Sequence, residues 1–92
     1  MKIELKQIDP LKLGLSKRIR VSLGLDRNYY IIKNIKSRII MKDGKKIAET
    51  ASIIKNQTNK QVFLATTAPV CSKTKTYLIS KDIQIVTDYS HN

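Results

Sequence analysis

The sequence has few of the residues that build catalytic and metal sites. Its single cysteine, Cys71, excludes an intrachain disulfide and a cysteine-based metal site. Its one histidine, His91, is the penultimate residue, a poor position for a preorganised catalytic base. Segment 43–46 (Asp-Gly-Lys-Lys) lacks both the first glycine and the Ser/Thr of a phosphate-binding loop. These absences predict that the protein is not an enzyme and has no catalytic, cofactor-binding or metal site.

Long hydrophobic runs are also absent. No segment approaches the roughly 20 apolar residues that a membrane-spanning helix needs. The chain begins Met-Lys-Ile-Glu, without the apolar stretch of a secretory signal. We therefore expect no membrane partner and a cytoplasmic location, or a place in the virion if a phage encodes the protein. No feature indicates a cofactor or a small-molecule substrate.

Acidic residues are scarce relative to basic ones. Eighteen Lys and Arg stand against seven Asp and Glu, which gives a formal net charge of +11 in 92 residues. A hydrophobic content of 41% is too high for a disordered basic tail, so a folded body is expected. A surface this basic exceeds what solubility needs and predicts contact with something anionic.

Short segments of alternating apolar and polar residues favour strands. Alternation is clearest in 2–8 and 18–25, and 62–66, 76–80 and 83–87 read as further short strands. Turn signals separate them every 8–12 residues or so, which is typical of a sandwich or barrel. The sequence thus predicts one all-β domain over 1–92. The expected fold is a small antiparallel β-sandwich, immunoglobulin-like or Greek-key, with a small barrel as second choice.

Segment 29–41 is ambiguous between helix and strand. Ile31, Ile32, Ile35 and Ile39 fit one helical face, yet isoleucine is stiff at χ1 and prefers sheet. The following Asp43-Gly44 pair is a strong signal for a two-residue hairpin turn. A turn there would pair residues 40 and 47 across the hairpin, so we prefer the hairpin and leave the helix open.

Two basic patches are the candidate binding surfaces for an anionic partner. The first runs from 17 to 33 and includes a tyrosine that could stack on a base, and the second lies at the expected hairpin tip. The candidate residues are Lys17, Arg18, Arg20, Arg27, Tyr29, Lys33, Lys42, Lys45 and Lys46.

Two functions fit these features. The favoured one is a non-catalytic structural or accessory subunit of a larger assembly, such as a phage or virus particle, present in several copies. Its Lys-rich surface would dock onto an acidic protein surface. The alternative is a non-specific nucleic-acid-binding protein that holds phosphates with these basic patches. If the alternative holds, Lys17, Arg18, Arg20, Lys45 and Lys46 should gather on one face.

Overall fold

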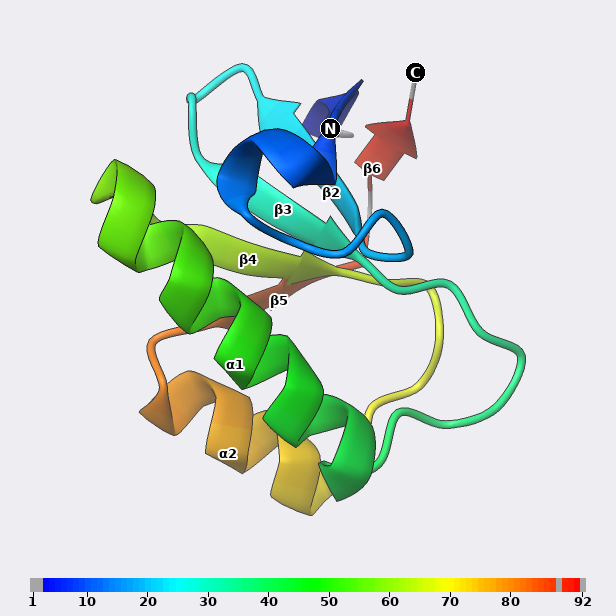
Figure 1. Ribbon diagram of the computed structural model, residues 1–92. Coiled ribbons are helices and arrows are strands. Elements are labelled where there is room, and N and C mark those ends of the chain that lie inside the picture. The colour runs from blue at the N-terminus through cyan, green and yellow to red at the C-terminus, as the bar shows by residue number, and fades with distance from the viewer. Residues whose placement is uncertain (1–2, 88, 92) are drawn as a thin grey trace.

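The computed structural model describes residues 3–87 and 89–91, and it shows a mixed α/β fold (Figure 1). The helical and strand elements, in chain order, are β1 (Ile3–Ile8), the 3-10 helix η1 (Pro10–Leu13), β2 (Arg20–Gly24), β3 (Tyr29–Ile32), α1 (Met41–Thr58), β4 (Val62–Ala65), α2 (Ser72–Ser80), β5 (Gln84–Val86) and β6 (Tyr89–His91). The expected all-β sandwich is therefore wrong, as is the small barrel.

Six strands form one sheet in the order β5-β4-β3-β2-β1-β6. The first three strands make an antiparallel meander, with Val21 opposite Ile31 in the β2–β3 pair. From β3 onward the chain crosses over through helices, so that β4 runs parallel to β3 and β5 runs parallel to β4. Crossover helices are the usual way to join parallel strands. This alternation of strand and helix replaces the antiparallel strands expected for the second half of the chain.

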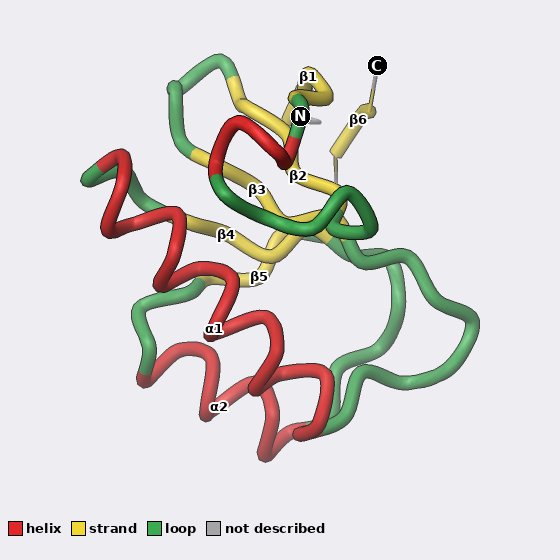
Figure 2. Tube along the Cα trace, viewed as in Figure 1, coloured by secondary structure: helices red, strands yellow, loops and turns green. Residues whose placement is uncertain are grey.

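Both long helices lie side by side against one face of the sheet, as Figure 2 shows in red against yellow strands. Strand residues that point to this face, among them Val21 and Leu64, form a single buried core with Ile47 and Ile54 of α1 and Leu78 of α2. The opposite face carries a smaller buried cluster of Leu5, Tyr30, Ile32 and Ala65. Neither helix of the described chain is long and apolar enough to cross a bilayer.

Helix α1 occupies the segment for which a hairpin was expected. Ile47, Ala51 and Ile54 are buried at helical spacing, so the apolar period is that of a helix and not of a strand. Asp43 lies in the first turn, where its carboxylate accepts a hydrogen bond from the Ile40 N–H at 3.2 Å. An acidic side chain there also favours the positive end of the helix dipole. The Asp-Gly pair thus belongs to a helix start.

Gly44 has a packing role. A Cβ added at Gly44 would lie 2.7 Å from the Cγ2 atom of Thr74, so the absence of a side chain lets α1 approach α2.

Helix α2 itself replaces the strand expected at 76–80. It buries Thr74 and Leu78 one turn apart and leaves Ile79 56% exposed. The alternation of Tyr77 and Ile79 was therefore misleading.

The remaining sequence expectations fare better. The strands expected at 2–8, 18–25 and 62–66 are present as β1, β2 and β4, and 83–87 contains β5. Residues 29–32 are a strand, and the chain from 33 to 40 is a loop before α1. The ambiguity over 29–41 thus resolves as strand and then loop, with the helix beginning at Met41.

Candidate nucleic-acid interface

A groove of about 420 Å³ lies between α1 and one end of the β2–β3 pair. The start of β2 and the end of β3 lie side by side in this antiparallel pair, with Arg20 opposite Ile32. Helix α1 forms the other wall through its middle turns. The buried residues Ile31, Ile32 and Ile47 supply part of the apolar lining of the groove.

The polar lining of the groove is strongly basic. Four of its residues are cationic, and a single lining residue is acidic, namely Glu49; the four cations are Arg18, Arg20, Lys33 and Lys46. We call these four residues the groove cations. Basic groups in a concave, partly apolar site focus positive potential, which attracts anions.

The groove cations differ in their partners. The Lys33 ammonium forms an ion pair with the Asp43 carboxylate at 3.7 Å, so its charge is partly compensated. Arg20 makes an interaction within the protein. Arg18 and Lys46 are both exposed and form no ion pair with any residue of the described chain. Their charges are therefore the most available to a ligand.

The structure brings together only part of the predicted surface. Lys17 is exposed next to Arg18, and Lys42 is exposed one helical turn before Lys46. Since residues four apart on a helix share a face, Lys42 extends the basic wall of the groove toward the start of α1. Lys45 is also exposed on α1 but does not line the groove.

Arg27 and Tyr29 lie at the opposite end of the β2–β3 pair, near the turn. The carboxylate of Asp26 organises this turn: it accepts hydrogen bonds from the Asn28 N–H at 3.1 Å and the Tyr30 hydroxyl at 2.9 Å. Partial burial opposes ionisation of Asp26, yet these bonds hold its pKa below the ordinary value. Burial, reinforced by the Asp26 carboxylate, raises the pKa of the Tyr30 phenol. This end of the hairpin is a structural turn.

Tyr29 is a poor candidate for base stacking. Its ring is half-buried and packs against the core beneath the helices. No aromatic residue of the described chain lines the groove. Base stacking is thus not a feature of this surface, which is suited instead to contact with phosphates.

The sequence patterns missed Glu49 and Asp43 as parts of this site. Glu49 lines the groove and Asp43 forms an ion pair with a groove cation. The hairpin interpretation placed Asp43 in the turn and Glu49 on the strand that follows it, with neither residue near 18–20. Recognition of the helical period at 47, 51 and 54 is the signal that would have placed them on α1.

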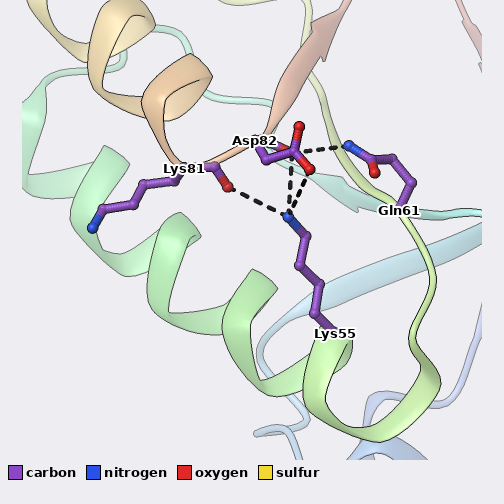
Figure 3. Close-up of polar contacts among 4 residues, drawn as sticks. All are labelled: Lys55, Gln61, Lys81 and Asp82. Carbon is purple, nitrogen blue, oxygen red and sulfur yellow. Dashed lines mark hydrogen bonds and ion pairs between the residues drawn. The ribbon is translucent and has the colours of Figure 1, made fainter.

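A second set of polar contacts lies at the other end of α1 (Figure 3). The Lys55 ammonium lies 3.6 Å from the Asp82 carboxylate and donates hydrogen bonds to the backbone carbonyls of Lys81 and Asp82 at 3.4 and 3.3 Å. The Gln61 amide donates to the same Asp82 carbonyl at 3.0 Å. These contacts tie the end of α1 to the loop between α2 and β5, a purely structural task.

Metal-ligating groups do not gather in the described chain. No three Asp, Glu, His or Cys residues of residues 3–87 and 89–91 lie close enough together to hold a metal ion. The side chain of His91 lies outside the part that the structure describes. Cys71 precedes α2, where the backbone N–H groups of Lys73 and Thr74 lower the pKa of its thiol. The groove has the positive charge to attract anions, but its lining in the described chain offers one carboxylate and no metal-ligand set.

Comparison with known proteins identifies the fold. Neither a protein-family model nor a curated protein matches the sequence. Three solved structures are similar: a repair endonuclease from Pyrococcus abyssi (TM-score 0.61, 9% identity, 78% of this chain and 31% of that one), EndoMS in complex with dsDNA (0.59, 12%, 72% and 28%) and EndoMS in its apo form (0.63, 10%, 96% and 37%). The chain spans about a third of the length of these proteins and shares the fold of one portion of them.

Two predictions need correction in the light of these matches. The favoured function, a structural or accessory subunit of a phage or virus particle, is wrong, because the similar structures include a repair endonuclease and a complex with dsDNA. The prediction that the protein is not an enzyme is also wrong, because it excluded a class of proteins that includes one of similar fold. It rested on the absence of catalytic and metal-binding motifs from the sequence, whereas the fold is one that a repair endonuclease shares.

Proposed function

We propose that this chain is a nucleic-acid-binding domain of endonuclease-like fold. It holds the phosphate backbone of double-stranded DNA in the groove between α1 and the β2–β3 pair. The observation that carries the proposal is the set of groove cations, two of which have no acidic partner in the described chain. A similar fold in EndoMS has been solved with double-stranded DNA, which supports the choice of a duplex.

The composition of the groove favours backbone contact without sequence reading. Lysine and arginine neutralise phosphates and release counterions whatever the base sequence. Specific reading of guanine commonly uses bidentate arginine contacts to base edges, and the chain has few arginines to supply them. We therefore expect dissociation constants in the range of roughly 10⁻⁴ to 10⁻⁶ M at physiological salt, with little dependence on base sequence.

The test compares charge reversal inside and outside the groove. Arg18→Glu with Lys46→Glu removes the two unpaired groove cations. Lys60→Glu with Lys75→Glu makes the same change in net charge at exposed residues that do not line the groove. Binding to a labelled 20-base-pair duplex (roughly two turns) is measured by fluorescence anisotropy at several salt concentrations.

We expect the groove variant to bind at least ~30-fold more weakly than the parent, and the control variant less than ~5-fold more weakly. The logarithm of the binding constant should also fall less steeply with the logarithm of salt in the groove variant, by about two units of slope. Equal losses in the two variants would show that net charge alone drives binding and would overturn the proposal. Circular dichroism confirms that both variants are folded.

A further inference from the structure

The acidic residues near the groove are arranged unlike a metal site. Nucleases often cut with one or two divalent cations, which carboxylates hold against the phosphate. Here Glu49 is the one acidic residue that lines the groove in the described chain. Asp43, the other nearby carboxylate, is occupied by the Lys33 ammonium and the Ile40 N–H. The residues present do not fit a resident metal ion.

We propose that the groove binds the phosphate backbone without a divalent cation, and that the groove cations supply the positive charge that such an ion would bring. This inference rests on the proposed function. Arg18 and Lys46 line the groove together with the buried Ile31 and Ile47, so we expect their charges to act on a phosphate that is partly shielded from water. A metal ion entering the same groove would meet four cationic side chains and one lining carboxylate, so we expect net repulsion.

Glu49 has a different role in this arrangement than in a metal site. Without a cation between them, its carboxylate and a bound phosphate repel each other. Glu49 then weakens binding. If a Mg²⁺ ion did bridge the two, Glu49 would strengthen binding, because Mg²⁺ is commonly held by one or two carboxylates together with substrate phosphates. The sign of the Glu49 effect therefore separates the two arrangements.

The experiment measures duplex binding by the parent and by Glu49→Gln, first with EDTA and then with millimolar MgCl₂ at matched ionic strength. Without a metal requirement, the parent binds at least as tightly with EDTA as with Mg²⁺, since Mg²⁺ competes for the phosphates. Glu49→Gln should bind about twofold to fivefold more tightly in both buffers, from the lost repulsion. The same mixtures are run on a denaturing gel to detect strand cleavage.

Three results would overturn the inference. They are affinity that rises tenfold or so with Mg²⁺, loss of that gain in Glu49→Gln, and Mg²⁺-dependent cleavage of the bound duplex. Failure of the proposed function looks different: the parent then binds in neither buffer, or Arg18→Glu with Lys46→Glu binds as the parent does. A matched acidic control, Glu4→Gln, alters an exposed carboxylate on β1 that does not line the groove and should change affinity little in either buffer.

Discussion

The two ends of α1 use the same kind of side chain for different tasks. At its C-terminal end, Lys55 is held by the Asp82 carboxylate and by two backbone carbonyls, and its side chain is 28% exposed. In the groove wall, Lys46 is exposed and has no ion-pair partner in the described chain. A basic residue with protein acceptors stabilises the fold, and one without them is available to a ligand. Basic charge alone therefore says little about function until the partners of each residue are known.

Among the variants that test this comparison of the two ends of α1, one that displaces the helix itself should have the largest effect. Gly44→Ala places a methyl group 2.7 Å from Thr74 Cγ2. Alanine is the better helix former, but overpacking should dominate and lower the free energy of unfolding by about 1–3 kcal/mol. Urea denaturation measures this change. Thr74→Ser removes the opposing methyl, so the double variant Gly44→Ala, Thr74→Ser should recover much of the loss. Equal stability of the single and double variants would show that this contact does not set the approach of the two helices.

Charge reversal should lower mainly the stability when it is made at Lys55, and mainly the duplex affinity when it is made at Lys46. Lys55→Glu places a carboxylate against Asp82 and two carbonyls and should cost about 1–2 kcal/mol of stability, with duplex affinity of the folded protein nearly unchanged. Lys46→Glu should leave stability within about 0.5 kcal/mol and weaken duplex binding about tenfold. Thermal denaturation and anisotropy on the same samples give both quantities. If both variants lose affinity and keep stability, the distinction between the two ends of α1 is wrong.

A smaller effect is expected at Asp43, which partly neutralises one groove cation. Asp43→Asn keeps an oxygen that can accept from the Ile40 N–H but releases the Lys33 charge. Duplex affinity should rise about twofold to threefold, and stability should fall by no more than about 1 kcal/mol, since exposed ion pairs contribute little. Weaker binding by this variant would mean that the Lys33–Asp43 pair positions Lys33 for the ligand instead of competing for it.

The sequence was informative where burial follows a clear local period. Alternation in 18–25 and the compact apolar run at 62–66 predicted β2 and β4 correctly, because a strand buried on one or both faces leaves such a pattern. The nine candidate residues chosen from the sequence also include all four groove cations. These four residues line one groove because of the β2–β3 pairing and the placement of α1. The sequence patterns predicted neither of these features.

Helix α1 shows why the fold class was missed. The Asp43-Gly44 pair has the composition of a hairpin turn, yet it serves as an acidic first turn and a point of close contact with Thr74. Ile47 was expected to pair with residue 40 across that hairpin, but Ile47 and Ile54 are buried at helical spacing, and this burial overrides the weak preference of isoleucine for sheet. Because α1 was interpreted as strand, neither the parallel pairing of β3 with β4 nor the groove beside α1 could be predicted.

The most direct test of the groove as a DNA interface is to follow amide chemical shifts of the isotope-labelled protein while a short duplex is added. Our account predicts saturable shifts concentrated in 18–20, 31–33 and 42–53, the segments that contain the groove lining and the basic start of α1. The amides of Lys55, Lys81 and Asp82 should move little, because that end of α1 is committed to internal contacts. Shifts centred on Lys55 and Asp82, or none that saturate, would contradict the account.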